Sequence, residues 1–302
     1  MPGWIRCGQS MAANAEGRQM RSPIFWFGGK GNMTAKLLPL IVPHHIYVEP
    51  FGGGASLLFS KSPSPVEVYN DLDGGLVNFF RVVRDERKFE QFHRLASLTP
   101  YARAEYNFCR ETWQSCEDDV ERAYRWFVVA RMSFGGRFGA GLGTVVTTSR
   151  RGMAETCSKW LSCIEMLPQV HARLMRVQIE QSDWRVILGR YDTPETFFYL
   201  DPPYLPSTRS SGEYEHELTL DDHADLVDVL LDLRGDAMLS CYWHDVYEPL
   251  VAAGWMRHEW NTACYAAART RATGIQGNGS ALAMQKRTET VLASHAMQPR
   301  LW

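Results

Sequence analysis

The sequence lacks the features that mark several whole classes of protein. Its seven cysteines form no CxxC pair and are odd in number, which argues against a metal site or a disulfide framework and favours a reducing cytoplasm. No continuous apolar run approaches the about 20 residues of a membrane span. The first 22 residues contain no run typical of a signal peptide, so residues 1–22 are predicted to be a disordered lead.

An excess of charge of one sign is also missing. The 302 residues carry 32 Lys and Arg against 34 Asp and Glu, a formal net charge of −2. The chain as a whole therefore does not attract a polyanion, and any nucleic-acid surface must be local. With 45% apolar residues and a length too short for two full cores, the sequence favours one α/β domain with an insertion.

Two short apolar runs near the start predict a strand, a helix and a second strand. Residues 46–49 end in an acid and precede three glycines at 52–54, after which residues 55–59 begin a helical pattern. The second apolar run, at 66–69, is followed by Asn70-Asp71. Buried strands separated by a helix are typical of a parallel sheet.

The pattern becomes helical between residues 75 and 176. Residues 117–134 predict a helix, because acids lie at its start and arginines lie later. A glycine-rich run at 135–143 ends this helix, and the β-branched run at 144–148 predicts one arm of a hairpin. Residues 75–176 are therefore interpreted as a mainly helical insertion.

The α/β pattern returns after residue 176. A capping box at 219–222 begins a helix. The stretch at 264–287 is rich in Ala, Gly, Thr and Arg and predicts a loop between the last two strands. Residues 23–74 and 177–302 are expected to form one catalytic domain, with further strands at 177–179, 197–200, 237–241 and 288–293.

The ends of the early strands carry groups suited to an adenosine ligand. The glycine turn allows close approach to the backbone, although Leu57 stands where a GxGxxG fingerprint has its third glycine. Asp71 can accept from both ribose hydroxyls, but an Asp here can also cap a helix. Asp183 can accept from an adenine amine while Trp184 covers the ring, and the alternative is a strand-end Asp beside a core Trp.

The tetrapeptide Asp201-Pro202-Pro203-Tyr204 follows an apolar strand, where α/β proteins bind their ligands. An aromatic amine that attacks a methyl sulfonium needs two acceptors for its N–H protons, because they favour a pyramidal nitrogen and stabilise the developing charge. The Asp201 carboxylate and the Pro202 carbonyl can supply them, and proline rigidity fixes the carbonyl. Tyr204 can stack on a base, which is worth about 1–3 kcal/mol. The alternative is a loop whose side chains only pack.

In these residues the chain resembles the Dam-like, or D12, class of DNA adenine-N6 methyltransferases, in which the cofactor motifs precede the target-recognition region. The resemblance extends from Phe25 to Ser294. Two positions depart from the family pattern: Phe27 replaces a small residue, and Phe25 stands where a basic residue is common, which argues against a base contact there. The matching segments are 25–30, 48–56, 69–71, 183 and 201–204, and less specifically 239–242 and 287–290.

The resemblance implies a fold and ligands. The fold is a Rossmann-like S-adenosylmethionine-dependent methyltransferase sheet, mixed with its last strand antiparallel, carrying a mainly helical target-recognition insertion. The implied cofactor is S-adenosylmethionine, and the implied substrate is adenine in double-stranded DNA. The resemblance also implies a cytoplasmic enzyme of a bacterium or a phage, of the kind found in restriction–modification, and the sequence leaves open whether a cognate restriction enzyme exists. The implied cofactor-binding residues are Trp26, Gly28, Lys30, Glu49, Phe51, Gly52, Gly54, Ser56, Asp71, Asp183 and Trp184.

The insertion is basic although the whole chain is not. Residues 122–176 contain nine Lys and Arg against two Asp and Glu, which suits phosphate contacts, and a solvated helical surface is the alternative. In the glycine-rich run, Arg137 can read guanine or phosphate and Phe138 can wedge between base pairs, unless the loop only packs on its own domain. The predicted DNA contacts are Arg131, Arg137, Phe138, Arg150 and Arg151.

An adenine must leave the duplex stack to reach such a site, and residues 205–217 after the catalytic motif predict a lid. The rival interpretations are a nicotinamide-dependent oxidoreductase, a chain that only binds DNA, and methylation of cytosine N4, RNA adenine or a protein amide. The missing third glycine and the tetrapeptide argue against the oxidoreductase, and the usable catalytic residues argue against a chain that only binds DNA. The basic insertion and the order of the motifs favour adenine in duplex DNA over the other substrates. The sequence leaves open the recognition sequence, and whether a monomer or a homodimer acts on a palindromic site.

Overall fold

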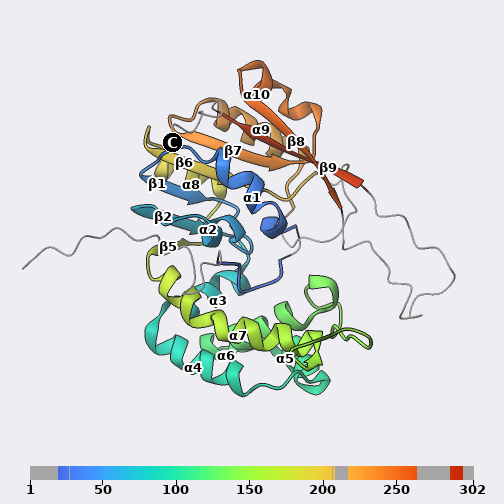
Figure 1. Cartoon of the computed structure of the whole chain (residues 1–302). Helices are drawn as coiled ribbons and strands as arrows, with labels where there is room; N and C mark the ends of the chain where they lie inside the picture. The colour runs from blue at the N-terminus through green and yellow to red at the C-terminus, as the bar shows by residue number, and fades with distance from the viewer. Residues whose placement is uncertain (1–19, 27, 206, 208–216, 264–285, 295–302) are drawn as a thin grey trace, which may run out of the picture.

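A seven-stranded sheet lies at the centre of the fold, with helices on both faces (Figure 1). The computed structural model describes residues 20–26, 28–205, 207, 217–263 and 286–294. Across the sheet the order is β5-β2-β1-β6-β7-β9-β8. These strands are β1 (Ile46–Glu49), β2 (Val66–Asn70), β5 (Val177–Glu180), β6 (Thr196–Leu200), β7 (Asp236–Cys241), β8 (Met256–Ala263) and β9 (Lys286–Ala293).

The helices and the remaining short elements follow the chain around this sheet. The α-helices are α1 (Thr34–Leu37), α2 (Ser56–Ser60), α3 (Gly74–Arg84), α4 (Glu86–Leu98), α5 (Arg103–Thr112), α6 (Asp119–Met132), α7 (Glu155–Leu174), α8 (Trp184–Tyr191), α9 (Leu220–Leu231) and α10 (Glu248–Ala252). The short elements are the 3-10 turns η1 (Lys30–Asn32), η2 (Leu38–Leu40), η3 (Phe134–Gly136) and η5 (Asp245–Tyr247), and a hairpin of β3 (Ser149–Arg150) and β4 (Met153–Ala154).

The central strands are apolar throughout because both faces of the sheet are covered. Every residue of β6 is buried, and β1 pairs in parallel with β2 on one side and β6 on the other. Parallel strands in such sheets form continuous apolar runs instead of alternating patterns. The strands predicted at 46–49, 66–69, 177–179, 197–200 and 237–241 are confirmed.

The last strand of the sheet is antiparallel, as predicted. β9 lies between β7 and β8 and runs against both, with Leu292 opposite Leu239 and Val291 opposite His258. The edge strand β8 was not predicted. Most of the loop predicted at 264–287 lies outside the described residues.

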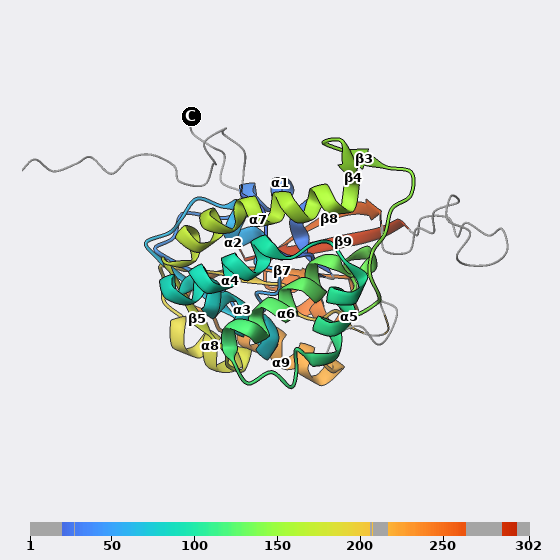
Figure 2. The ribbon, with the colours of Figure 1, turned by 90° about the horizontal axis from the view of Figure 1, so that it is seen from below.

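The helical insertion shares one hydrophobic core with the sheet. Helices α3 to α7 gather on one side of the sheet in both ribbon views (Figures 1 and 2). Tyr69 and Val177 of the sheet belong to the same buried cluster as Phe79, Trp126 and Leu167 of α3, α6 and α7. A second cluster lies under α8, α9 and α10 on the opposite face. The insertion is therefore continuous with the catalytic fold in its packing.

Two local predictions need correction. Residues 144–148 form no strand, because Gly143 is tied to the end of α6 by a 2.7 Å hydrogen bond from its N–H to the Met132 carbonyl, and the hairpin begins only at Ser149. The predicted lead is too long, since Met20 is buried in the core. The helix at 117–134 and the capping box at Thr219 are confirmed.

Membrane insertion finds no support in the described part of the chain. None of the helices described there has both the length and the apolar character needed to cross a bilayer.

Candidate active site

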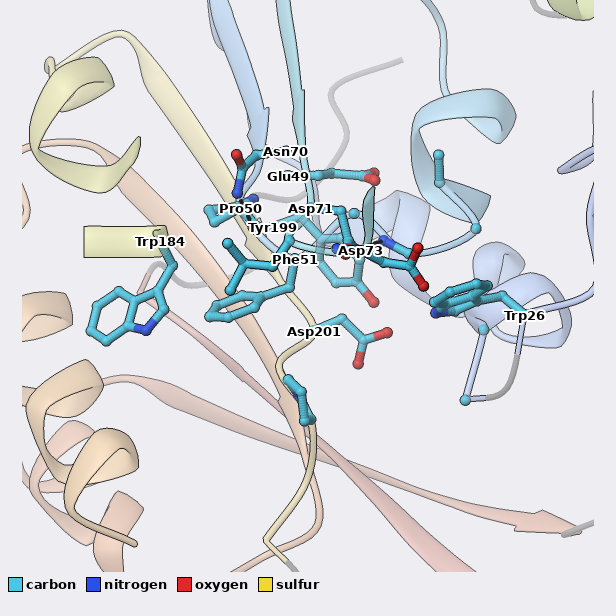
Figure 3. Close-up of a pocket in the computed structure, with 18 of the residues that line it drawn as sticks. Trp26, Glu49, Pro50, Phe51, Asn70, Asp71, Asp73, Trp184, Tyr199 and Asp201 are labelled. Carbon is cyan, nitrogen blue, oxygen red and sulfur yellow. Dashed lines mark hydrogen bonds between the residues drawn. The ribbon is translucent and has the colours of Figure 1, made fainter. Parts of the chain in front are cut away.

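A cavity of about 480 Å³ lies where β1, β2 and β6 end (Figure 3). Its walls come from segments that are far apart in the sequence and meet because parallel strands end at the same edge of the sheet. Asp201 and Pro203 of the tetrapeptide line it, whereas Pro202 and Tyr204 do not. All eleven predicted cofactor residues line it: Trp26, Gly28, Lys30, Glu49, Phe51, Gly52, Gly54, Ser56, Asp71, Asp183 and Trp184.

The glycine turn after β1 has no room for side chains. A Cβ atom on Gly52 would stand 2.2 Å from the ring of Tyr69, and one on Gly53 would stand 2.8 Å from the indole of Trp26. Gly53 also has a φ of +46°, a left-handed conformation that favours glycine. These glycines therefore let the backbone itself form one wall of the cavity.

Asp71 is held in place by the backbone around it. Its carboxylate accepts the N–H of Gly53 at 2.7 Å and the N–H of Asp73 at 2.9 Å. The preceding Asn70 joins three strand ends, because its amide donates to the carbonyls of Pro50 and Ser182 at 2.8 and 2.9 Å. A carboxylate offers about four lone-pair sites, so these two bonds are compatible with further hydroxyl donors.

Glu49 is a buried acid in the cavity wall. It is 1% exposed and accepts the Tyr47 hydroxyl at 2.7 Å. Burial raises the pKa of Glu49 to about 8, against the lowering effect of this hydrogen bond. The carboxyl is therefore largely protonated at pH 7, and a cation beside it would favour ionisation.

The sequence left open whether Asp183 and Trp184 line a ligand site or are a strand-end Asp beside a core Trp, and the structure shows features of both. Asp183 lines the cavity and also caps α8, since it accepts the Arg185 N–H at 2.8 Å. Trp184 is 2% exposed and packs in the core, with its ring centroid 6.2 Å from that of Phe51. In the view of Figure 3, Phe51 lies between Trp184 and Asp201. The indole nitrogen of Trp184 is buried and has no hydrogen-bond partner among the described residues.

The carboxylate of Asp201 is paired with Lys30. The Lys30 Nζ donates to both oxygens of Asp201, at 2.7 and 2.9 Å, and to the Gly28 carbonyl at 2.9 Å. It also lies 3.5 Å from the carboxylate of Glu289. Burial alone would lower the pKa of Lys30, but the two carboxylates reverse this effect and raise it, so the amine stays protonated.

Tyr204 faces this ion pair and not the open cavity. It is 7% exposed, and its hydroxyl donates to the carboxylate of Glu289. The Lys30 Nζ lies 4.8 Å from its ring centroid, and the ring of Tyr242 packs edge-on at 4.7 Å. The ring face that the sequence assigned to base stacking is therefore covered in this structure.

The backbone of the tetrapeptide is fixed from the side by α9. His223 is fully buried, and its Nε2 lies 3.1 Å from the Pro203 carbonyl, while its Nδ1 lies 2.8 Å from the Tyr247 hydroxyl. Burial lowers the pKa of His223 to about 4, so the ring is neutral at physiological pH. A neutral ring that accepts from Tyr247 at Nδ1 donates from Nε2, which orients the catalytic loop.

Side-chain hydroxyls hold the backbone of the glycine-rich loop after α6, and the loop carries two aromatic side chains. The hydroxyls of Tyr106 and Ser133 accept backbone N–H groups of Gly141 and Gly139, each at 3.0 Å. Phe138 packs on the rings of two tryptophans of the insertion, with centroid distances of 5.5 and 5.6 Å. Phe134 is more exposed, at 62% against 41% for Phe138, and the sequence had not singled it out.

Several basic residues of the insertion contact other residues of the protein and are therefore not all available to DNA. Arg173 is buried and pairs with Glu67 of β2, so it cannot contact DNA. Arg151 pairs with Glu165 at 2.9 Å on the surface, a contact that solvent and phosphate can replace. The guanidinium of Arg131 stacks 4.2 Å from the ring centroid of Phe25. Arg137 and Arg150 are exposed.

The sequence interpretation missed three features of the site: the pairing of Lys30 with Asp201, the acid Glu289 and the buried His223. Lys30 was expected to contact the cofactor, and its pairing with a residue 171 positions away leaves no local pattern. Glu289 lies in a segment that resembles the family only loosely. His223 follows the capping box of α9, and the only available signal was its position on the apolar helix face.

The mixed sheet, with a glycine turn, strand-end acids and an Asp-Pro-Pro-Tyr segment around one cavity, defines the class of Rossmann-like methyltransferases. The model of the D12 class N6 adenine-specific DNA methyltransferases matches residues 26–245, and the chain belongs to this family. It is similar to the Type II methyltransferase M1.LlaDCHI of Lactococcus lactis subsp. cremoris. The two are 27% identical over 224 residues, which cover 70% of this chain and 76% of that protein.

Proposed function

We propose that this chain transfers a methyl group from S-adenosylmethionine to N6 of an adenine flipped out of double-stranded DNA. The observation that carries the proposal is the single cavity in which Asp201 shares a wall with the glycine turn, Asp71 and Asp183. Family membership supplies the adenine and the DNA. The cavity supports the cofactor and the site of methyl transfer, because the residues assigned to the cofactor and Asp201 line the same space.

The residues around the cavity fit this cofactor. Gly52 and Gly53 form a cradle that a Cβ atom would fill, and the buried indole nitrogen of Trp184 lacks a partner among the described residues. Asp71 would accept the ribose hydroxyls, and Asp183 the adenine amine. Glu49 would face the cationic part of the molecule. S-Adenosylmethionine supplies an electrophilic methyl group on a positively charged sulfur.

The residues of the tetrapeptide would hold the target amine. Asp201 accepts one N–H and the Pro202 carbonyl accepts the other, which favours a pyramidal nitrogen with an available lone pair. His223 holds the neighbouring Pro203 carbonyl and so fixes the direction of the loop. Lys30 neutralises the buried carboxylate before the amine arrives. Residues 206 and 208–216 of the predicted lid lie outside the described residues.

The DNA would contact the glycine-rich loop and the adjacent hairpin. Arg137 and Arg150 are exposed there, and Phe134 presents an aromatic ring to solvent. The loop lies beside the cofactor site, because an added Cβ on Gly136 would stand 3.3 Å from Phe25, which precedes the cavity residue Trp26. A rigid loop with a basic and an aromatic side chain suits phosphate contact and base displacement.

The proposal is tested by identifying the methylated product. The purified full chain is incubated with methyl-labelled S-adenosylmethionine and unmethylated duplex DNA, which is then digested to nucleosides and separated. We expect the label in N6-methyl-2′-deoxyadenosine. Asp201→Ala should lose transfer, because it removes an acceptor of the target amine, and should still bind the cofactor by calorimetry, because Glu289 remains within ion-pair distance of Lys30. Label in N4-methylcytosine, or turnover retained without Asp201, would overturn the proposal.

A further inference from the structure

Glu289 lies against the catalytic tetrapeptide without belonging to it. It is near the middle of β9, the antiparallel strand between β7 and β8, and its side chain is buried. Its carboxylate accepts the hydroxyl of Tyr204 and lies 3.5 Å from the Nζ of Lys30. One acid therefore contacts two groups that also surround Asp201.

Lys30 consequently has two carboxylate partners and prefers one of them. It donates to both oxygens of Asp201 at 2.7 and 2.9 Å, against 3.5 Å to Glu289. Of its three N–H donors, one is used by the Gly28 carbonyl at 2.9 Å. The other two donors go to the two oxygens of Asp201, so Glu289 interacts with the ammonium through its charge at 3.5 Å.

This arrangement conflicts with the acceptor role proposed for Asp201. A target amine needs an oxygen of Asp201 for its own N–H, and Lys30 occupies both oxygens in this structure. Each oxygen keeps a lone pair for a further donor, but the positive charge that develops on the amine during transfer repels the Lys30 ammonium and favours its withdrawal from Asp201. A buried ammonium that loses its counter-ion is strongly destabilised unless another acid takes its place. Glu289 is the acid already within ion-pair distance.

We propose that Glu289 is a positioning residue that takes over the ion pair with Lys30 when the target amine reaches Asp201. Through the same carboxylate it also holds the hydroxyl of Tyr204. The inference rests on the proposed function, since it concerns how Asp201 becomes available to the amine. No covalent step is involved, because only hydrogen-bond partners are exchanged.

The first test separates the charge of Glu289 from its hydrogen bond. Glu289→Gln keeps an acceptor for Tyr204 and loses the charge that attracts Lys30, whereas Glu289→Ala loses both. In single-turnover reactions at saturating cofactor and DNA, we expect both variants to slow methylation about 10- to 100-fold, the range of a small misplacement of reacting groups. Cofactor affinity should change less than about twofold. A Glu289→Gln rate within about threefold of wild type would overturn the proposal.

The second test needs no turnover and shows whether Glu289 acts through Lys30. Affinity is measured for duplexes that carry adenine or purine at the target, because purine lacks the amine that contacts Asp201. Wild type should prefer adenine, and Glu289→Gln should lose most of that preference. In a Lys30→Met background, Glu289→Gln should change the preference less than about twofold. An equal loss in both backgrounds would show a role independent of Lys30 and overturn the proposal.

The control and the order of experiments keep two failures apart. Glu259→Gln changes an exposed acid on the neighbouring strand β8 and should leave the rate and the preference unchanged. Failure of the proposed function would appear first, as wild type that does not methylate adenine. Failure of the present inference would appear if wild type methylates adenine and the Glu289→Gln variant does so equally well.

Discussion

Replacing Glu49 by Gln tests the claim that a neutral acid lines the cofactor cavity. The pKa of Glu49 rises from 4.5 to about 8 because the side chain is buried. Each unit of pKa shift corresponds to about 1.4 kcal/mol. The distance from 4.5 to pH 7 is about 2.5 units, so at pH 7 the folded state loses about 3 kcal/mol of stability by keeping this carboxyl protonated.

The sign of the pH dependence follows from proton counting. Between pH 4.5 and 8 the folded chain holds a proton on Glu49 that the unfolded chain has released. The stability associated with Glu49 is therefore complete below about pH 4.5 and falls as the pH rises through the folded pKa. Gln at this position carries no titrating proton and can keep the hydrogen bond with Tyr47.

The assay is urea unfolding at pH 6, 7 and 8 without cofactor. We expect the free energy of unfolding of Glu49→Gln, relative to wild type, to rise by about 1 kcal/mol per pH unit and to level off above pH 8. Glu90→Gln, which changes an exposed acid of α4, should show no such trend. A difference between Glu49→Gln and wild type that stays constant from pH 6 to 8 would refute the reasoning.

Three further substitutions give expectations of different kinds. Gly52→Ala places a Cβ atom 2.2 Å from a tyrosine ring and should destabilise the chain by about 1–3 kcal/mol and weaken cofactor binding, as seen by urea unfolding and calorimetry, whereas Gly189→Ala meets no atom and should not. His223→Phe releases the carbonyl of the catalytic loop and should lower kcat about 10-fold at unchanged cofactor affinity. Arg137→Ala should weaken DNA binding and lower the slope of affinity against salt by about one, whereas Arg190→Ala should not; unchanged affinity across the salt series would exclude Arg137 from the interface.

The positions of the cofactor residues could be predicted because they depend on local signals. Apolar runs mark the strands, and each run ends at a glycine or an acid. Parallel strands end at the same edge of a sheet, so groups such as Gly52, Asp71 and Asp183 meet there without further information. Trp26, Gly28 and Lys30, which precede β1, were assigned from the family resemblance instead, and they line the same cavity.

The remaining features depend on contacts that leave no local pattern. The ion pair between Lys30 and Asp201 joins residues 171 positions apart. Strand β8 is an edge strand whose Arg257 and Glu259 give it no continuous apolar run. The β-branched residues at 144–148 favour a strand, but hydrogen bonds hold the preceding Gly141 and Gly143 at the end of α6, and the hairpin begins only at Ser149. In each case tertiary contacts outweigh local preference.

The segment before α1 connects the three parts of the site. Phe25 stacks against Arg131 of α6 and lies beside the glycine-rich loop. Trp26, the next residue, covers the glycine turn and lies 6.2 Å from the ring of Trp126 in the insertion. Lys30, four residues further, holds Asp201. Because these contacts are made within six consecutive positions, a displacement of the glycine-rich loop against Phe25 would act on the same short stretch of backbone that lines the cavity and holds Asp201. If the glycine-rich loop contacts DNA as proposed, this stretch would connect that contact to Asp201 without a base contact at position 25.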